Sequence, residues 1–448
     1  MFALYCTLNR LENKGKTMLD IKQIRENPQE VEKKLQTKEE GVSVQNILKL
    51  DGEIRSLKIE AEELKNIRNQ SAKEVGEKKR QGEDVTLLLK SMEGAKEKIS
   101  TLDHKCNELE AQLKFELGCL PNLPEEGIKA SLDPADNVEI KTFGEKPSFS
   151  FEPKNHLELN EKLHLFDFKR GAKIGGSGWP AYRGMGARLE WALINFMIDT
   201  HVANGFEQWI PPLLGRSDIL FGSAHLPKFE DQLFKLRDKD HDLYLIPTSE
   251  AVLNGIHYDE ILKEEELPLK YTAYTPCFRR EAGAAGAGER GLIRTHQFNK
   301  VEIFCVTRPE ESEKIYNEMV ESAETILQAL NIHYRSMLLV TGDMSFASAK
   351  TIDLEVWLPG QNRYYEVSSI SNCTDFQARR SKIRFKRGEG KPELAHTLNG
   401  SGLATSRLMV ALLENNQQED GSVTIPPVLH KYLGGVSQLG CSPAGSAD

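Results

Sequence analysis

The stretch "LAHTLNGSGLATSRLMVALLEN", residues 394–415, is predicted to change its structure halfway along. Its first half is predicted to form a strand that passes through Gly400 and Gly402, and its second half a helix that carries Arg407. Glycine has no Cβ and lets the backbone approach a ligand closely. We therefore expect a ligand-binding turn at these glycines, with Arg407 projecting beside it.

A second stretch, "FRREAGAAGAGERGLIRTHQF" at residues 278–298, places Arg279 and Glu281 before a run of glycine and alanine and Arg294 after it. An arginine fork matches phosphate oxygens, and a carboxylate accepts a hydrogen bond from the exocyclic amine of adenine. A flexible loop between such groups can close over a nucleotide and open again. A polar hairpin with salt bridges at its base would carry the same residues, so this stretch alone leaves both interpretations open.

The whole chain has the composition of a folded protein with more than one domain. Its 448 residues exceed one ordinary core, so two domains are expected. It is 39% hydrophobic and 28% charged, and no apolar run is long enough for a membrane-spanning helix. The net charge of −9 disfavours a wholly basic nucleic-acid binder but leaves room for a local basic surface.

The cysteines indicate the cellular compartment of the protein, and the two ends of the chain are expected to be disordered. The seven cysteines are odd in number, and no pair has the C-x-x-C spacing of a zinc site or a redox motif. We expect reduced, mostly buried thiols in a cytoplasmic protein. Residues 1–17 have no helical pattern and do not resemble a signal peptide, so we expect a disordered leader before a helical start at Met18. The small, polar residues 435–448 are expected to form a disordered tail.

Residues 45–115 follow a heptad-like pattern in which apolar residues step by three and four. The pattern lapses over "SAKEVGEKKRQGEDV", residues 71–85, which contains two glycines, so the chain is expected to turn there. Two helices joined by a turn form an antiparallel hairpin. An arm of about forty residues would project about 60 Å at the α-helical rise.

Basic residues gather near the expected turn: Arg68, Lys73, Lys78, Lys79, Arg80 and Lys90. A charge run is usually a solvated face, and a helical hairpin commonly serves dimerisation or scaffolding. Basic residues at the far end of a rigid arm can also contact the phosphates of a polyanion. These interpretations are all open at this point.

Beyond the linker "LPNLPEEG", residues 120–127, predicted strands follow one another without regular helical crossovers. This order indicates an antiparallel sheet and an α+β fold. A predicted amphipathic helix precedes a short strand that ends at Pro211 and Pro212. We expect a helical hairpin domain at residues 18–120 and a second domain at residues 121–434.

Three stretches resemble, in chain order, the three motifs of class II aminoacyl-tRNA synthetases: the helix and strand ending at Pro211 and Pro212, "FRRE" with its loop, and "LNGSGLATSR". Four others, "PTSE", "HQFNKVEIF", "YYEVSSISNCTDFQARR" and "HTLNGSGLA", resemble the seryl-tRNA synthetases of the bacterial type. The resemblance extends from about Met18 to Leu433, and the hairpin lies where that family has a coiled-coil arm. It implies an antiparallel catalytic sheet flanked by helices, in a homodimer.

The resemblance also implies an activity. Such an enzyme uses ATP and Mg²⁺ to convert L-serine to seryl-adenylate and then transfers the seryl group to tRNA(Ser). The hairpin would grip the long variable arm of that tRNA, with contacts at Arg68, Lys73, Lys78, Lys79 and Arg80. The same contact would admit tRNA(Sec) where the organism has one. No separate block of sequence remains for an editing domain, so the serine pocket would have to select serine over other amino acids without one.

The resemblance implies catalytic roles for Arg279, Glu281 and Arg407 in binding ATP. Arg279 would hold the α-phosphate, Glu281 the adenine amine, and Arg407 the far end of the triphosphate. Glu366 and Ser369 would supply oxygens to ATP and to Mg²⁺, which takes few protein ligands and keeps several waters. The full set of ATP-binding residues implied is Arg279, Arg280, Glu281, Arg294, Phe298, Glu366, Val367, Ser368, Ser369 and Arg407.

For the amino acid, the resemblance implies a pocket of carboxylates and hydroxyls, which match the ammonium and hydroxyl of serine. Alanine would leave a buried polar group unpaired, and threonine would need room for one more methyl group. The serine-binding residues implied are Thr248, Ser249, Glu250, Arg279, Glu302, Asn399 and Ser401.

Two alternatives remain open. A relative with the same fold could activate another amino acid or use a carrier substrate, although the pairing of "TSE" with "NGS" and the N-terminal hairpin argue against it. A non-catalytic coiled-coil or RNA-binding protein could be built on an inactive scaffold. Loss of Arg279, Glu302 or Arg407 would favour that alternative, and all three are present.

Overall fold

The computed structural model describes residues 19–281 and 291–440. The leader expected at residues 1–17, most of the glycine- and alanine-rich loop and the last eight residues of the chain lie outside these ranges. Within them, no helix is long and apolar enough to cross a membrane. The cysteines in the described ranges are free thiols and mostly buried, as the sequence predicts.

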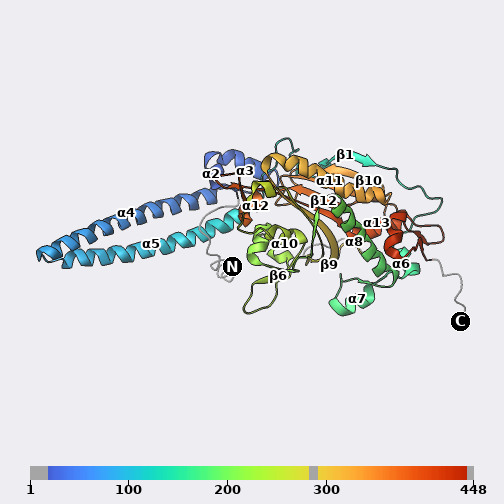
Figure 1. Cartoon of the computed structure of the whole chain (residues 1–448), viewed down its shortest axis with the longest axis horizontal. Coiled ribbons are helices and arrows are strands. Elements are labelled where there is room, and N and C mark those ends of the chain that lie inside the picture. The colour runs from blue at the N-terminus through green and yellow to red at the C-terminus, as the bar shows by residue number, and fades with distance from the viewer. Residues whose placement is uncertain (1–18, 282–290, 441–448) are drawn as a thin grey trace. The chain divides into compact units, whose positions relative to one another are not determined.

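The described residues divide into two compact units, and the first holds residues 19–36 and 40–120. Its helices are α2 (Ile21–Glu26), α3 (Pro28–Gln36), α4 (Gln45–Gln81) and α5 (Thr86–Gly118). Helices α4 and α5 lie side by side as an antiparallel arm (Figure 1). The 37 residues of α4 span about 55 Å at the α-helical rise.

An apolar seam joins the two helices of this arm. Its buried members include Ile47, Leu50, Ile54 and Ala61 from α4 and Ile99, Cys106 and Leu113 from α5. Because residues three and four apart share one face of a helix, this spacing produces a continuous stripe on each partner. The predicted helical hairpin is thereby confirmed.

The turn of the arm is shorter than the sequence predicts. Helix α4 continues through Gln81, so the chain turns within the predicted segment, residues 71–85, but only residues 82–85 form the connection to α5. Glu, Lys and Arg are common in this segment and are good helix formers, so the helix persists where the apolar stripe lapses. It ends at Gly82, whose φ of 77° is left-handed.

The second unit, residues 37–39 and 121–440, is built around an eight-stranded sheet (Figure 1). The strand order is β1-β10-β11-β12-β15-β9-β8-β4, and all neighbours pair antiparallel except β4 and β8. The bounds are β1 (Val138–Phe143), β4 (Glu207–Trp209), β8 (Leu269–Phe278), β9 (Gln297–Thr307), β10 (Tyr334–Leu338), β11 (Lys350–Leu358), β12 (Arg363–Asn372) and β15 (His396–Ala404). The predicted α+β fold with an antiparallel sheet is confirmed.

Helices flank this sheet and supply its main core. Leu193 of α8, Met319 of α11 and Leu412 of α13 pack with Val301 and Ile303 of the sheet. The helices of this unit are α6 (His156–Leu163), α7 (Phe168–Gly175), α8 (Met185–Ala203), α9 (Ser217–Gly222), α10 (Ser249–Gly255), α11 (Ser312–Ala329), α12 (Phe376–Ser381), α13 (Thr405–Asn415) and α14 (Pro427–His430).

Strand β9 sends alternate side chains to two different environments. Val301 and Ile303 enter the core formed with α8, α11 and α13. Phe304 belongs to a smaller apolar cluster formed with α10 and α12. Because successive residues of a strand point to opposite faces, Lys300 and Glu302 lie on the face of Phe304, beside α10. That face carries the candidate site.

A bulge on β12 borders the same face. Glu366 and Ser368 stand opposite two consecutive residues of β11, so Val367 is the extra residue. In a regular strand, residues three apart point to opposite faces. Because the bulge changes this alternation, Glu366 and Ser369 line the same cavity.

Gly400 and Gly402 lie within β15, which corrects the expectation of a ligand-binding turn. A Cβ at Gly402 would lie 2.3 Å from Nε2 of His201, and one at Gly400 would lie 2.9 Å from Cγ1 of Ile370. His201 Nε2 in turn lies 2.8 Å from the carbonyl oxygen of Gly402. Burial lowers the pKa of His201 to about 4, so the ring is neutral and packs α8 against the strand. These glycines therefore serve close packing.

The segment after residue 434 is structured as far as residue 440, contrary to the disordered tail expected from residue 435. Strand β17 (Gln438–Leu439) pairs antiparallel with β16 (Val423–Thr424), and Leu439 is 3% exposed within the main core. Two apolar residues, Val436 and Leu439, in a short polar segment show no periodicity, so the sequence gives little sign of this strand. The other short strands are β2 (Phe166–Asp167), β3 (Ala181–Tyr182), β5 (Leu214–Arg216), β6 (Leu243–Leu245), β7 (Ile261–Lys263), β13 (Arg384–Lys386) and β14 (Glu393–Leu394).

This packing predicts that Leu439→Ala lowers the free energy of unfolding by about 2–4 kcal/mol, because it leaves a cavity in a closed core. Ser437→Ala, at an exposed position in the same segment, is the matched control and should change it by less than about 0.5 kcal/mol. Urea titration of both variants measures the difference. Identical midpoints for Leu439→Ala and the parent would show that the segment does not pack.

Candidate active site

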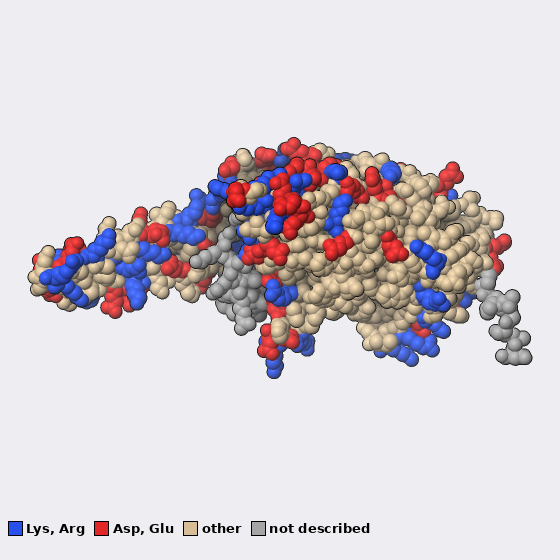
Figure 2. Space-filling model, in the orientation of Figure 1, with Lys and Arg blue, Asp and Glu red and all other residues tan. Residues whose placement is uncertain are grey.

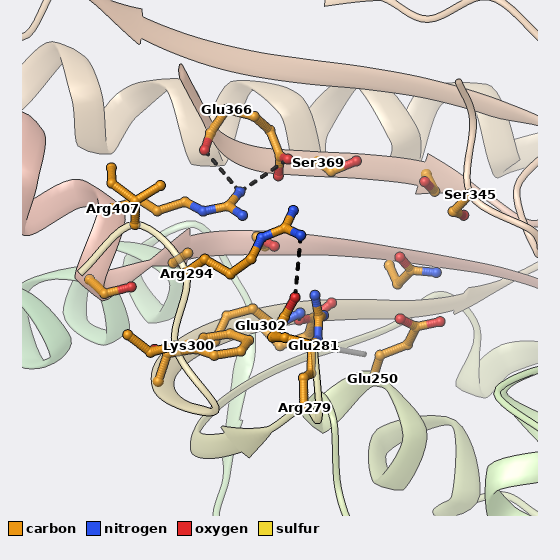
Figure 3. A pocket seen from close by; sticks show the side chains of 18 residues that line it. Glu250, Arg279, Glu281, Arg294, Lys300, Glu302, Ser345, Glu366, Ser369 and Arg407 are labelled. Carbon is orange, nitrogen blue, oxygen red and sulfur yellow. Dashed lines mark hydrogen bonds and ion pairs between the residues drawn. The ribbon is translucent and has the colours of Figure 1, made fainter. Parts of the chain in front are cut away.

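A cavity of about 270 Å³ opens on the face of the sheet that carries Lys300 and Glu302 (Figure 3). Helix α10, strands β9, β12 and β15, helix α13 and connecting segments, including the one that follows β8, form its walls. The predicted residues that line it are Glu250, Arg279, Glu281, Arg294, Phe298, Glu302, Glu366, Ser369, Asn399, Ser401 and Arg407. Residues up to 157 positions apart in the chain, from Glu250 to Arg407, therefore share one cavity.

Charges of both signs line the cavity in equal number. The acidic members are Glu250, Glu281, Glu302 and Glu366, and the basic members are Arg279, Arg294, Lys300 and Arg407. Buried charges are tolerated when they are paired or hydrogen-bonded. A cavity of this kind fits ligands that themselves carry charges of both signs.

Arg279 follows the last residue of β8 and is held from three directions. Its amide donates to the carbonyl oxygen of His296 at 2.9 Å, and its Nε donates to the carbonyl oxygen of Pro247 at 3.3 Å. The guanidinium carbon lies 5.2 Å from the centre of the Phe298 ring. A guanidinium fixed by a carbonyl and a ring still has N–H groups to present to an anion in the cavity.

Arg407 lies in the first turn of α13 and contacts the bulged strand. Its Nη1 is 3.1 Å from Oε2 of Glu366 and 3.1 Å from the carbonyl oxygen of the same residue (Figure 3). Its guanidinium carbon also lies 5.0 Å from the centre of the Tyr365 ring. Arg407 and Glu366 therefore form one paired unit at this end of the cavity.

Arg294 and Glu281 form a second pair, with Arg294 pointing toward Glu281 (Figure 3). The distance from Nη1 to Oε2 is 3.6 Å, which is an ion pair rather than a close hydrogen bond. Glu281 has a φ of 49°, an uncommon conformation for a residue other than glycine. Such backbone strain is concentrated at functional sites.

Glu302 lies in the middle of the sheet and is 1% exposed. Thr248 donates its hydroxyl to Glu302 Oε2 at 3.1 Å, and Lys300 forms an ion pair with the same oxygen. Burial raises the pKa of the Glu302 carboxyl, and the charge of Lys300 opposes that rise most strongly. Ser401 stands beside Glu302 on the neighbouring strand β15. These groups form a compact polar pocket for a small ligand.

Glu250, in the first turn of α10, supplies a second carboxylate to this pocket. Its Oε1 accepts a hydrogen bond from Nε2 of Gln377 at 2.6 Å. Burial, and then the nearby charge of Glu302, raise the pKa of Glu250 to about 7. Two carboxylates so close together favour a ligand with a positive charge.

The donor set on β12 fits a hard divalent cation such as Mg²⁺. Glu366 and Ser369 line the cavity, and Asp353 stands opposite Ser369 on β11. Oδ1 of Asp353 is buried and has no hydrogen-bond partner among the described residues. All three side chains present oxygen, which is the ligand atom that Mg²⁺ prefers.

Five predicted residues do not line the cavity: Thr248, Ser249, Arg280, Val367 and Ser368. Thr248 reaches it only through its bond to Glu302, and Ser249 is fully buried at the start of α10. Arg280 points to solvent, because it neighbours Arg279 along an extended segment. Val367 turns into the apolar core at the bulge, and Ser368 donates to the carbonyl oxygen of Ser401 at 2.5 Å. The contacts with ATP or serine that the resemblance implies for these residues therefore remain predictions, and their side chains do not line the cavity.

The cavity also includes residues that sequence reasoning missed: Ile293, Thr295, Lys300, Ser345, Ser371, Ala404 and Ser406. Lys300 could have been found, because it lies two residues from both Phe298 and Glu302 on one face of a predicted strand. Ser345 comes from a loop between β10 and β11 and had no local signal.

The basic residues predicted to contact tRNA lie in the last turns of α4, in the other unit. The arm patch, defined here as Lys73, Lys78, Lys79 and Arg80, lies along this end of the arm, where Figure 2 shows Lys and Arg side chains. Lys78 pairs with Glu74 at 2.8 Å. Lys73, Lys79 and Arg80 are exposed. Most of the patch is thus available to solvent.

Family models match two parts of the chain. Residues 18–124 match the Seryl-tRNA synthetase N-terminal domain, and residues 229–416 match the tRNA synthetase class II core domain (G, H, P, S and T). The first range contains the arm, and the second contains every residue that lines the cavity. Fold and cavity together define a class II aminoacyl-tRNA synthetase.

Full-length relatives narrow this class. The chain is 53% identical over 416 residues to the serine–tRNA ligase of Chlamydia abortus, covering 93% of this chain and 98% of that protein. It is 52% identical to the serine–tRNA ligase of Chlamydia pneumoniae, covering 94% of this chain and 99% of that one.

Solved structures agree with the sequence relatives. The seryl-tRNA synthetase of Pyrococcus horikoshii complexed with ATP has a TM-score of 0.86 at 40% identity, covering 94% of this chain and 99% of that one. The cytoplasmic serine–tRNA ligase of Naegleria fowleri in complex with AMP has a TM-score of 0.80 at 28% identity, covering 92% and 96%. The chain belongs to the serine–tRNA ligase family, as the sequence motifs predict.

Behind the cavity, α8 carries a buried glutamate that the sequence did not single out. Glu190 is 4% exposed, its Oε1 accepts from Nδ2 of Asn299 at 2.9 Å, and its Oε2 has no partner among the described residues. Burial raises its pKa to about 7. Asn299 lies between Phe298 and Lys300, so this contact supports the strand that lines the cavity.

We predict that Glu190→Gln becomes more stable relative to the parent as pH rises. In the parent, this carboxyl ionises near 4.5 when unfolded but only near 7 when folded, so its contribution to folding is lost as pH rises between those values. Glutamine does not ionise, and the difference in unfolding free energy should therefore shift by about 1–3 kcal/mol between about pH 5 and pH 8. Urea titrations at both pH values measure it, and a constant difference would contradict the buried, ionisable state.

Proposed function

We propose that this serine–tRNA ligase forms seryl-adenylate in the cavity and then esterifies tRNA(Ser). The observation that supports this most directly is that a ring and an arginine suited to a nucleotide line the same cavity as a buried glutamate suited to an amino acid, and that this glutamate accepts the hydroxyl of Thr248. Activation requires both ligands to meet in this way.

In the proposed first step, an oxygen of the serine carboxylate attacks the α-phosphorus of ATP. The new bond joins carboxylate oxygen to phosphorus, and the bond between that phosphorus and the bridging oxygen of pyrophosphate breaks. Arg279 would contact both anions, and its guanidinium, held by the Pro247 carbonyl and the Phe298 ring, would neutralise charge as the bond forms. No protein nucleophile takes part.

ATP would be held by side chains at both ends. The adenine would stack against Phe298 and donate its amine to Glu281, and Arg407 would leave Glu366 to bind the terminal phosphate. Mg²⁺, bound by Glu366 and Ser369 and closed in by Asp353, would supply positive charge for the phosphates.

Serine would be recognised by the polar pocket around Glu302. Its ammonium would contact the carboxylates of Glu250 and Glu302, and its hydroxyl would contact the oxygen groups contributed by Thr248, Asn399 and Ser401. Alanine lacks the hydroxyl and would leave these buried groups unpaired. The pocket would thereby discriminate without an editing site.

Transfer of the seryl group would require tRNA binding by residues 18–120. The arm patch would contact phosphates of the long variable arm of tRNA(Ser), and of tRNA(Sec) where present. Residues 121–434 would carry the chemistry. The enzyme would act as a homodimer, which would cover three exposed apolar residues on and after α8: Trp191, Val202 and Ile210. It would act in the cytoplasm.

Arg279→Ala and Arg407→Ala should each reduce serine-dependent ATP–pyrophosphate exchange by about 10²–10³-fold or more, since each removes a charge that stabilises the triphosphate. Arg363→Ala is the matched control: its guanidinium lies 4.9 Å from the same Tyr365 ring but does not line the cavity. All three should retain the thermal unfolding midpoint within a few degrees. Near-parent exchange in either test variant would contradict its assignment.

The arm patch is tested by salt dependence. Replacing Lys73, Lys78, Lys79 and Arg80 by glutamine should weaken tRNA(Ser) binding and reduce the slope of log affinity against log salt by about 3, while pyrophosphate exchange is unchanged. Filter-binding titrations between about 50 and 200 mM salt measure the slope.

The matched control for the arm replaces Lys49, Lys96, Lys98 and Lys105, four exposed lysines elsewhere on the same helices. It makes the same change of net charge and should alter the slope little. Equal effects of the two sets, or none from the patch, would place the tRNA contact on other residues.

A further inference from the structure

One charged residue in the cavity has no part in the function proposed above. Lys300 is 6% exposed and is the one lysine among the described residues that line the cavity. It lies on β9 midway between Phe298 and Glu302, all on one face. On the adjoining strands it stands beside Thr275 and Ala404, neither of which is charged.

The partner of Lys300 is the carboxylate proposed to bind the ammonium of serine. Its Nζ forms an ion pair with Oε2 of Glu302, the same oxygen that accepts the Thr248 hydroxyl. Two groups thus fix one oxygen of Glu302 and leave Oε1 for a ligand. Both side chains of the pair are at least nine-tenths buried, so neither charge is compensated by water.

Other charged or titratable groups face this pair from the surrounding elements. Glu250 of α10 adds negative charge, and Arg279 after β8 adds positive charge but is held by Pro247 and Phe298. Burial raises the pKa of the Cys277 thiol on β8, which stays neutral. Burial, with Arg279 and Lys300 nearby, lowers the pKa of His225 to about 3, so that ring is also neutral.

We propose that Lys300 is a positioning residue for serine: its ammonium keeps Glu302 ionised and aims the free oxygen of that carboxylate at the substrate ammonium. The proposal rests on the function proposed above. It assigns Lys300 no contact with serine or ATP. Lys300 acts on serine through Glu302.

The Glu302 carboxyl is buried in the middle of the sheet. Burial favours the protonated form of Glu302, and Lys300 is the strongest influence in the opposite direction. A protonated Glu302 would lose its negative charge, and its carboxyl oxygens would be weaker acceptors for the ammonium of serine, which can only donate. Arg279 also favours the ionised form of Glu302, but less strongly than Lys300, and its guanidinium is held by the Pro247 carbonyl and the Phe298 ring. Without Lys300, the pocket would bind serine poorly at neutral pH.

The test uses Lys300→Met in the full chain, with serine-dependent ATP–pyrophosphate exchange measured from about pH 6 to pH 8.5. The KM for serine should rise about 10- to 100-fold at pH 7, while the KM for ATP changes less than about threefold. The ratio of serine KM between variant and parent should fall as pH rises, because higher pH restores the ionised Glu302. Lys300 also opposes the rise in the pKa of Glu250, so both carboxyls of the pocket should be more protonated in the variant than in the parent at low pH.

Two further variants separate positioning from structural support. Lys300→Arg keeps the charge and should stay within about fivefold of the parent in serine KM. Lys270→Met is the matched control: this lysine on β8 forms an ion pair with Glu318 outside the cavity, and its loss should leave serine KM unchanged.

A double-mutant cycle gives the sharpest outcome. Because Lys300 acts through Glu302, adding Lys300→Met to Glu302→Gln should change serine KM by less than about threefold beyond Glu302→Gln alone. The double variant removes both buried charges, so it remains informative where Lys300→Met alone fails to fold. Multiplicative effects in the cycle, or an unchanged serine KM in Lys300→Met at every pH, would overturn the proposal. An inactive parent would instead overturn the proposed function.

Discussion

The site depends on keeping several charges buried on one face of an antiparallel sheet. Glu302 is almost fully buried, and its charge is supported by Lys300 on the same strand and by the hydroxyl of Thr248. A carboxylate in such a position is costly unless it is paired and hydrogen-bonded. The start of α10, which carries Thr248 and Glu250, and the course of β9 are therefore constrained by electrostatics as well as by packing.

Strand β9 meets two demands at once because its side chains alternate. Val301 and Ile303 fill the core beneath α8, α11 and α13, while Lys300 and Glu302 occupy the opposite face. The apolar side makes the strand rigid, and rigidity holds the charged side in place. The bulge at Val367 extends the same arrangement to β12, where an irregular step brings Glu366 and Ser369 to one cavity.

Much of this structure could be predicted from the sequence, because hydrophobic periodicity and sequence motifs are both strong in this chain. The α+β class and the helical arm could be predicted from periodicity. Eleven site residues could be predicted from sequence motifs, and all eleven line one cavity. Irregular features had no such signal. The bulge at Val367 and the strand at Leu439 depend on contacts between distant segments, and the last turns of α4, where Val75 is the one buried apolar residue, depend largely on helix propensity. The role of Lys300 was not predicted, because within its motif only Glu302 was assigned to the serine pocket.

The central claim is that this cavity joins ATP specifically to serine. Wild-type ATP–pyrophosphate exchange measured with each of the twenty amino acids in turn tests it most directly. The account predicts exchange with serine that exceeds exchange with alanine, glycine or threonine by about 10²-fold or more, because only serine satisfies the buried carboxylates and hydroxyls without added bulk. Comparable exchange with alanine or threonine would contradict it.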